Sequence, residues 1–226
     1  MTSADTAPLA APAGIRGRKR ERTRRAISDA AFRLFAERGF DAVTLNRIAA
    51  EADVAPATVF THFASKEDIF FSRREEFRAG LPAAVTGART GAEVIEGVRR
   101  FFADACELVL GAEAVDNGRI FARVLLESPA LARSYLPLAR QRQTLLAELL
   151  AERAGAPAEG PDRAELDLFA ALAVAAGETA FDALHRALAA GEPVERVRRT
   201  VTEALDRAFA RLARAYEDSP VLDVSG

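Results

Sequence analysis

The chain has 226 residues, of which half are hydrophobic and 28% are charged, and its formal net charge at pH 7 is −2. This balance is typical of a globular protein of one or two domains and excludes an intrinsically disordered chain. A single cysteine excludes an internal disulfide framework and fits a reducing cytoplasm. The only two histidines are far apart in sequence, which argues against a dedicated zinc site.

The N-terminal segment, residues 1–19, is predicted to be a flexible basic arm. Its first 14 residues are small and rich in Pro and Ala, unlike a signal peptide, and no apolar run in the chain approaches the roughly 18 residues that span a bilayer. Basic residues dominate from Arg16 to Arg25, where Glu21 is the only acidic residue. Because phosphate neutralisation supplies sequence-independent DNA affinity, this cluster favours DNA contact, and the alternative is a solvated charge run.

The charge is divided unevenly along the chain. Residues 1–79 carry 14 Lys and Arg against 11 Asp and Glu, whereas the remainder carries 17 against 22. The small negative net charge therefore hides a basic N-terminal part, which is the distribution expected if only that part meets nucleic acid.

Helical spacing of apolar residues predicts a first helix from about Arg20 to Arg38. The segment from Thr44 to Phe63 then reads as two short helices around a tight turn, the layout of a helix-turn-helix. The Thr44 hydroxyl can cap the first of these helices. Asp53 occupies the turn, where a residue tolerant of positive φ is needed, and Pro56 pre-sets the start of the second helix.

A fourth helix is expected to begin after Ser65, which can cap it in a capping-box arrangement with Asp68. Ile69, Phe70 and Phe77 would supply its buried side. Gly80-Leu81-Pro82 then interrupts the pattern, so we expect this domain to cover residues 20–80.

The remainder shows helical periodicity without the alternation of a strand, so the predicted fold is all-α. A larger helical domain should cover residues 81–217, followed by a flexible tail over 218–226. Its last two helical segments, Ala164 to Ala190 and Pro193 to Glu217, carry stripes of small and apolar residues. We expect these segments to form a homodimer interface as a four-helix bundle, and the alternative is that both stripes are buried within one subunit.

Three segments carry a family resemblance: Arg24 to Phe40, Thr44 to Phe63, and Phe63 to Phe71. In this order they resemble the N-terminal three-helix DNA-binding domain of the TetR family of bacterial repressors, over roughly residues 20–79. The resemblance implies a cytoplasmic, all-helical homodimer, located at the nucleoid when bound to DNA. It also implies a repressor that leaves a palindromic double-stranded operator when a small, largely apolar ligand binds the C-terminal domain. No cofactor, metal or membrane partner is expected.

Matching positions in the family motif imply which residues meet DNA. The residues expected to face bases are Asn46, Ala55, Pro56, Ala57 and Thr61. The residues expected to face the backbone are Thr44, Thr58, Phe60, His62 and Lys66. Asn46 suits a bidentate contact with adenine or a contact with phosphate, and Arg47 could pair with a phosphate or only solvate its helix.

Three positions depart from the family pattern. Asp53 replaces the usual Gly, Ala55 replaces a capping Ser, and Phe60 replaces a Tyr whose hydroxyl often contacts phosphate. These departures affect individual contacts with DNA and leave the expected fold unchanged.

The sequence identifies the residues of an effector site less clearly than those of the DNA-binding motif. Its candidate lining residues, which could equally be ordinary core, are Phe101, Phe102, Phe121, Leu125, Tyr135, Phe169 and Phe181. Glu178, Asp182 and His185 lie on one helical face and could present a polar end to a ligand, or form a solvated or interface-paired strip.

Two other classes of function are disfavoured. The sequence lacks a phosphate-binding Gly-rich loop, a nucleophile elbow, a zinc-protease motif and paired cysteines, so we expect no enzyme. A ligand-independent architectural DNA binder would not need so large a helical domain after its DNA-binding domain.

Overall fold

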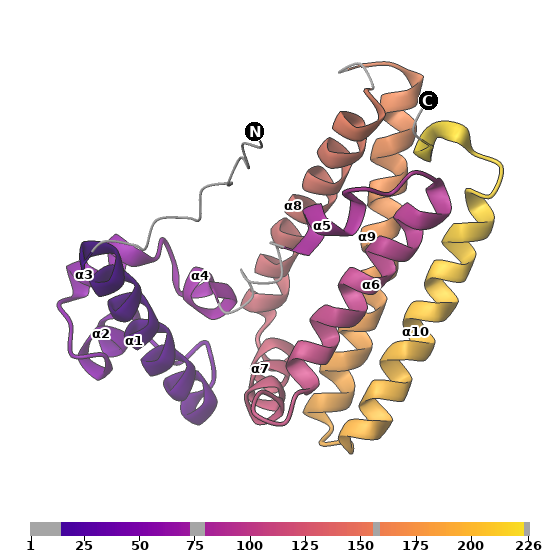
Figure 1. Ribbon diagram of the computed structural model, residues 1–226. Coiled ribbons are helices and arrows are strands. Elements are labelled where there is room, and N and C mark those ends of the chain that lie inside the picture. The colour runs from indigo at the N-terminus through magenta and orange to yellow at the C-terminus, as the bar shows by residue number, and fades with distance from the viewer. Residues whose placement is uncertain (1–14, 73–79, 156–158, 224–226) are drawn as a thin grey trace, which may run out of the picture. The chain divides into compact units, whose positions relative to one another are not determined.

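A computed structural model describes residues 15–72, 80–155 and 159–223 (Figure 1). The described residues form helices joined by turns and include no strand, which confirms the predicted all-α fold. The chain divides into two compact units. The first contains the described residues up to Arg38 together with Ala42–Ser72, and the second contains Gly39–Asp41 and the residues from Gly80 onward.

The described residues of the first unit form four helices: α1 (Ile15–Arg38), α2 (Leu45–Glu51), α3 (Pro56–His62) and α4 (Lys66–Phe71). The side chains at its centre are almost completely buried and recur at helical spacing along α1. They are Ile27, Ala30, Ala31, Leu34, Phe35, Ile48, Ala49, Val59, Ile69 and Phe70. Phe35 and Phe70 meet edge to face with ring centroids 6.0 Å apart, which ties α1 to α4.

The first helix begins earlier than the sequence pattern indicated. It starts at Ile15, so residues 15–19 are helical and are not the flexible arm that we expected. Arg and Lys are good helix formers, and a helix already stabilised by its packed segment extends through them at little cost. Residues 1–14 lie outside the described part of the chain.

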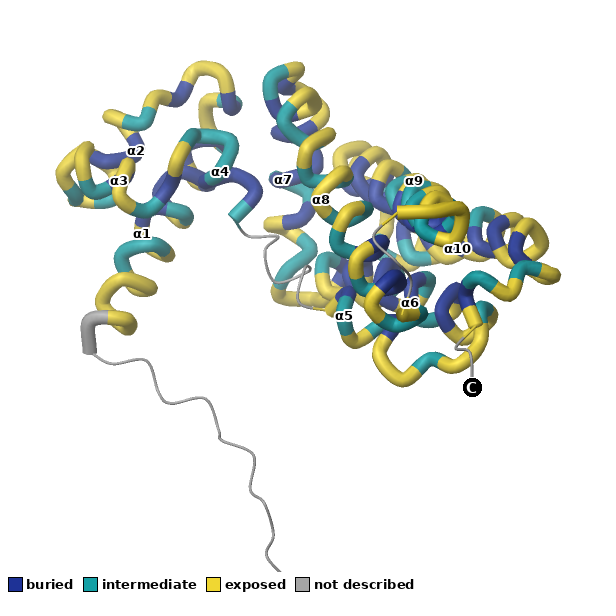
Figure 2. Tube along the Cα trace, turned by 90° about the horizontal axis from the view of Figure 1, so that it is seen from above, coloured by how far each residue is buried: buried dark blue, intermediate teal, exposed yellow. Residues whose placement is uncertain are grey.

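The second unit is a bundle of helices (Figure 1). Its elements are α5 (Gly80–Val85), α6 (Gly91–Leu110), α7 (Val115–Glu127), α8 (Pro129–Ala154), α9 (Pro161–Ala189), α10 (Val194–Ala215) and the short 3₁₀ helix η2 (Pro220–Leu222). Figure 2 shows buried and exposed positions alternating along these helices, as amphipathic helices around one core require. The α9 helix packs against α6, α7, α8 and α10 and so lies at the centre of the unit.

The expected boundary between the domains differs from the one observed. The first unit ends at Ser72, and α5, which begins at Gly80, belongs to the second. Phe77, which we expected on the buried side of the fourth helix, lies outside the described residues.

The C-terminal segment is packed where a flexible tail was expected. Leu222 is completely buried. Arg153 on α8 donates hydrogen bonds to the carbonyl oxygens of Ala88 (2.9 Å) and Leu222 (2.6 Å). The backbone N–H of Gly91 donates to the Asp223 carboxylate at 2.8 Å. These bonds join residues 222 and 223 to α8 and to the first residue of α6, so residues 220–223 are part of the bundle.

The apolar stripe of α10 is buried within its own chain. Val197, Val201, Leu205, Phe209 and Leu212 are each at most 6% exposed and belong to the core of the second unit. On α9, the small residues Ala170, Ala173, Gly177 and Ala180 are buried in the same core. These positions of the two stripes are thus buried within one subunit, which is the alternative stated above, because helical periodicity reports burial without identifying the partner.

Gly177 shows how closely α6 and α9 approach. A Cβ atom at this position would lie 2.3 Å from three ring carbons of Phe102. That ring packs against Phe101, Phe181 and Phe209, with centroid distances of 5.1, 5.4 and 6.4 Å. The small residues of α9 therefore accommodate an aromatic cluster of the same chain.

By length and composition alone, α9 is apolar enough to cross a membrane. Half of its most apolar window is buried inside the bundle, which is the arrangement of a core helix. The exposed part of α9 includes Leu168, which is 49% exposed, and Leu172, which is 43% exposed.

Candidate functional site

Local chemistry sets the geometry of α2, the turn and α3. The backbone N–H of Arg47 donates to Thr44 Oγ1 at 3.3 Å, so Thr44 caps α2 as predicted. Asp53 adopts φ of +54°, the only positive φ of a described non-glycine residue. The N–H of Val54 donates to the Ala49 carbonyl at 3.0 Å and closes the turn.

The N-terminus of α3 lacks a side-chain cap. Ala55 stands at the cap position, and no side chain there accepts a hydrogen bond from the helix. Pro56 at the first helical position has no N–H, so one donor that would otherwise need a partner is absent. The short helix therefore depends on tertiary contacts, among them the fully buried side chain of Val59.

Most of the eleven residues predicted to meet DNA are exposed. The exposed residues are Thr44, Asn46, Arg47, Ala55, Pro56, Ala57, Phe60 and Thr61, whereas Thr58, His62 and Lys66 are half-buried. Phe60 is 59% exposed, which is unusual for an aromatic side chain. The first unit thus presents small and polar side chains together with one uncovered ring on α2 and α3.

Besides Thr44, which caps α2, two of these predicted contact residues hold intramolecular hydrogen bonds through their side chains. Lys66 Nζ donates to the Val43 carbonyl at 2.9 Å, and so links α4 to the segment before α2. Thr61 Oγ1 donates to the Ala57 carbonyl one turn earlier, also at 2.9 Å. An ammonium has three protons and a hydroxyl oxygen can also accept, so these bonds leave capacity for a phosphate or a base edge.

The structure identifies a further residue next to α3 that the sequence pattern did not single out. Arg24 Nη1 donates to the His62 carbonyl at 3.0 Å, and its guanidinium carbon lies 4.4 Å from the centre of the Phe63 ring. In the sequence Arg24 is one of seven basic residues within a stretch of ten. Arg24 lies three residues before the buried Ile27, so helical spacing places it on the packed face of α1. This spacing could have distinguished Arg24 from the other basic residues of the cluster.

Burial lowers the pKa of His62 below 6.5, and the nearby positive charges of Arg20 and Arg24 lower it further. The unfolded chain therefore takes up this proton more readily than the folded chain does. We expect the stability contributed by neutral His62 to be complete above pH 6.5 and to be lost as the pH falls below that value. In urea unfolding at pH 7.5 and pH 5.5, His62→Gln should lose less stability on acidification than the wild type, and an equal loss in both proteins would contradict this.

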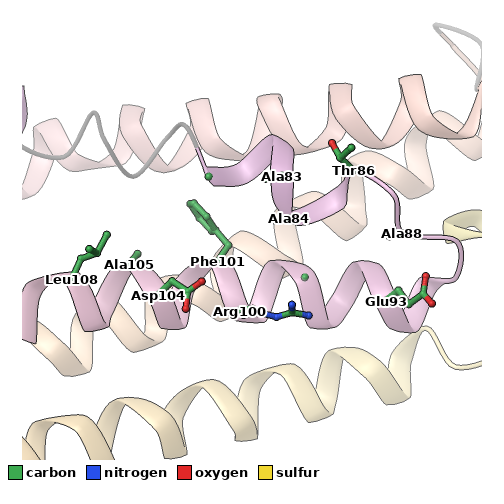
Figure 3. A pocket seen from close by; sticks show the side chains of 12 residues that line it. Ala83, Ala84, Thr86, Ala88, Glu93, Arg100, Phe101, Asp104, Ala105 and Leu108 are labelled. Atoms are coloured by element: carbon green, nitrogen blue, oxygen red, sulfur yellow. The ribbon is translucent and has the colours of Figure 1, made fainter. Parts of the chain in front are cut away.

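A hollow of about 500 Å³ lies between α5 and α6 in the second unit (Figure 3). Its wall consists mainly of small and apolar residues: Gly80, Ala83, Ala84, Ala88, Gly97, Phe101, Ala105 and Leu108. Glu93, Arg100 and Asp104 add charged groups along α6, and Phe101 points from α6 toward α5 (Figure 3). This volume falls within the usual range for small-molecule pockets.

Of the nine predicted ligand residues, Phe101 lies in the wall of this hollow. Phe102, Phe169 and Phe181 are at most 3% exposed in the packed core, and Phe121 and Leu125 are each 7% exposed. The sequence could not separate these positions, because a core residue and a pocket residue show the same periodicity.

Two of the remaining predicted ligand residues, Tyr135 and Glu178, belong to a polar group between α8 and α9. The Tyr135 hydroxyl donates to Glu178 Oε2 at 2.7 Å, and Arg142 Nε donates to Glu178 Oε1 at 3.1 Å. The ring of His185, which is 3% exposed, stacks on Phe181 with centroids 6.4 Å apart. Asp182 is exposed, so the polar strip predicted on α9 is divided between two environments. Arg142, which the sequence pattern did not single out, forms an ion pair with Glu178.

The chain is similar to known regulatory proteins. Residues 27–72 match the family model described as bacterial regulatory proteins, tetR family. The HTH-type transcriptional regulator TcmR of Streptomyces glaucescens is 30% identical over 150 residues, covering 63% of this chain and 65% of TcmR. An HTH-type transcriptional regulator of Haemophilus influenzae is 40% identical over 70 residues, covering 30% of this chain and 33% of its own length. The matches thus span less than two thirds of these relatives.

Solved structures share the fold over most of the chain. The complex of SmeT with triclosan has a TM-score of 0.57 at 23% identity and covers 84% of this chain and 91% of SmeT. SmeT is the repressor of the Stenotrophomonas maltophilia multidrug efflux pump SmeDEF. The TetR-family regulator SCO0857 of Streptomyces coelicolor has a TM-score of 0.50 at 23% identity, with coverage of 90% and 99%. At this level of identity the likeness concerns the fold.

Proposed function

We propose that this chain, a member of the TetR family of bacterial regulatory proteins, is a DNA-binding transcriptional repressor with a ligand-controlled operator. A small, largely apolar ligand bound to the second unit would release it from a palindromic DNA site. The observation that carries the DNA half of this proposal is the capped α2, the turn at Asp53 and the exposed face of α3.

The exposed face of α3 suits the major groove. Ala55, Ala57 and Thr61 are small, so the helix backbone can approach base edges closely, and the exposed ring of Phe60 can make apolar contacts. Asn46 is exposed on α2, and its side-chain amide can pair with adenine in two hydrogen bonds. Arg47 supplies a cation for a phosphate.

We expect Asn46→Ala and Arg47→Ala to affect DNA binding differently. Asn46→Ala should relax base preference at one position of each half-site and weaken the free energy of operator binding by about 1–3 kcal/mol. Arg47→Ala should weaken binding to all sequences alike and reduce the salt slope by about one. Selection from random duplexes, followed by titration of the selected site at several salt concentrations, measures both effects. If the wild-type protein enriches no palindromic site, the proposed sequence-specific control is wrong.

We propose that the exposed face of α9 forms the homodimer contact. Leu168 and Leu172 are half-exposed leucines four residues apart, and Ala175 and Thr179 continue the same face. Small and apolar side chains there allow a second copy of the helix to approach closely in an isologous interface.

Leu172→Lys should shift the protein from dimer to monomer without unfolding it, because the side chain is exposed in one chain and would be desolvated only between two. Leu126 on α7 is 53% exposed, so Leu126→Lys is a matched control that should leave the dimer intact. Sedimentation at micromolar concentration reads the outcome, and a monomeric wild-type protein would exclude this interface.

The hollow between α5 and α6 supports the effector half of the proposal. Its lining is mainly apolar, and its charged groups stand along one side on α6, where they can orient a ligand. A ligand shifts DNA affinity only through its different affinities for the DNA-competent and incompetent forms, so a useful inducer needs a preference of about a hundredfold. A calorimetric screen of apolar compounds, followed by operator titration, tests this. If the compounds that bind change operator affinity by less than twofold, release of the protein from DNA by a ligand is excluded.

A further inference from the structure

We propose that Arg24 is a positioning residue that holds the C-terminal end of α3 in its base-reading orientation, rather than one of the phosphate-binding cations of the basic cluster. The proposal rests on the DNA-reading function proposed for α3. It assigns to Arg24 a role that depends on the shape of its guanidinium and not on its charge alone.

Two contacts from Arg24 meet at the end of α3. The His62 carbonyl lies in the last turn of the helix, where carbonyl groups lack partners within the helix, and it accepts the 3.0 Å hydrogen bond from Arg24 Nη1. The guanidinium also stacks over Phe63, the residue that caps α3, at 4.4 Å from the ring centre. Phe63 is only 2% exposed, so its ring is a fixed surface. The cation also lies at the negative end of the helix dipole.

Apart from its packing against α2, α3 has few restraints of its own. The helix has seven residues, well below the roughly 12–15 at which isolated helices become marginal in water, and its N-terminus has no side-chain cap. Val59 anchors the buried face. A contact at the C-terminal end is therefore needed to fix the direction of the helix, and with it the positions of Phe60 and Thr61 on the exposed side.

The surroundings of Arg24 differ from those of its neighbours. Arg18, Lys19, Arg20, Arg22 and Arg25 are exposed, whereas Arg24 is half-buried. Arg25 forms an ion pair with Glu21 on its own helix at 3.0 Å. A planar guanidinium can stack on a ring and donate from its edge at the same time, and a lysine ammonium cannot reproduce that combination. Lysine at this position thus separates the effect of charge from the effect of position.

The experiment compares Arg24→Lys, Arg24→Gln and the exposed control Arg22→Gln, using the full chain. Affinities for the selected operator and for random duplex are measured over a range of salt concentrations. Both Arg24 variants should lose operator affinity by about tenfold and to the same extent, with little change on random duplex and an unchanged salt slope. The ratio of specific to non-specific affinity should fall by the same factor. Arg22→Gln should leave that ratio unchanged.

The opposite pattern would overturn the proposal. If Arg24→Lys keeps the operator affinity of the wild type while Arg24→Gln loses it and lowers the salt slope by about one, Arg24 is a phosphate contact. The positioning role is also excluded if both Arg24 variants weaken binding to operator and to random duplex by equal factors.

A second measurement examines the contact in the absence of DNA, so that a failed operator selection would count against the proposed function and not against this contact. Hydrogen exchange of the Phe63 amide, which donates to the Val59 carbonyl at 2.9 Å, should accelerate in Arg24→Lys while the centre of α1 stays protected. Phe63→Leu removes the stacking surface and keeps an apolar core residue. In the double variant, Phe63→Leu should add little to the loss of operator discrimination that Arg24→Lys causes alone. Fully additive losses from the two substitutions would count against a shared role of the two residues.

Discussion

Val201→Glu is expected to unfold the helical bundle at a cost of several kcal/mol, rather than to separate two intact subunits. Val201 is 3% exposed and lies on α10 in the same core as Leu205 and Phe209. A carboxylate there would have no described cation within the apolar stripe and would either remain charged without a partner or take up a proton. Both outcomes remove much of the stability of a typical domain.

Urea unfolding followed by far-UV circular dichroism measures this effect, and Thr202→Glu is the matched control. Thr202 is exposed on the same turn of α10, so a glutamate there should change stability by no more than about 0.5 kcal/mol. A Val201→Glu protein that keeps the wild-type unfolding midpoint but sediments as a monomer would show that α10 forms the subunit interface after all.

Gly97→Ala should destabilise the second unit by about 1–3 kcal/mol and also reduce ligand binding. A Cβ atom at this position would lie 1.9 Å from the carbonyl oxygen of Ala84, which is a backbone atom of α5 and cannot be relieved by a rotamer change. The clash must move α5 away from α6. Gly97 also lies in the wall of the hollow between these helices, so the same movement would alter the proposed effector site.

Gly111→Ala is the control for the loss of backbone entropy that a Gly→Ala change brings to the unfolded chain. Gly111 caps the same helix with φ of −57°, and an added Cβ would meet only ordinary contacts at 3.7 Å or more. Thermal unfolding and calorimetry with a compound found by screening should therefore distinguish the two variants. If Gly97→Ala matches the wild type in both measurements, α5 does not pack against α6 at this distance.

The helix-turn-helix could be predicted closely because its signals are local. A hydroxyl caps the next turn, an aspartate tolerates positive φ, and a proline starts a helix, each within about four residues of sequence. Thr44 and Asp53 accordingly behave in the structure as the sequence predicts. The contacts of Arg24 and Lys66 could not be predicted in this way, because they join residues 38 and 23 positions apart.

The second unit shows where periodicity stops being informative. Phe101 and Phe102 are adjacent on α6, yet one lines the hollow and the other is completely buried against Gly177. On α10 the most regular stripe is core, whereas on α9 the exposed apolar face includes Leu168 and Leu172, which the sequence pattern did not assign to the interface. Spacing identifies a face of a helix, and only the packing of the other helices identifies what covers that face.

The contact between Phe102 and Gly177 has an evolutionary consequence. Since a Cβ atom at position 177 would overlap the aromatic ring, an alanine can arise there without loss of packing only after residue 102 has become smaller. A smaller residue at 102 that arises first leaves a cavity beside Phe181 and Phe209. Either order passes through a less stable intermediate sequence, so descendants that keep this bundle should either retain both residues or have exchanged both.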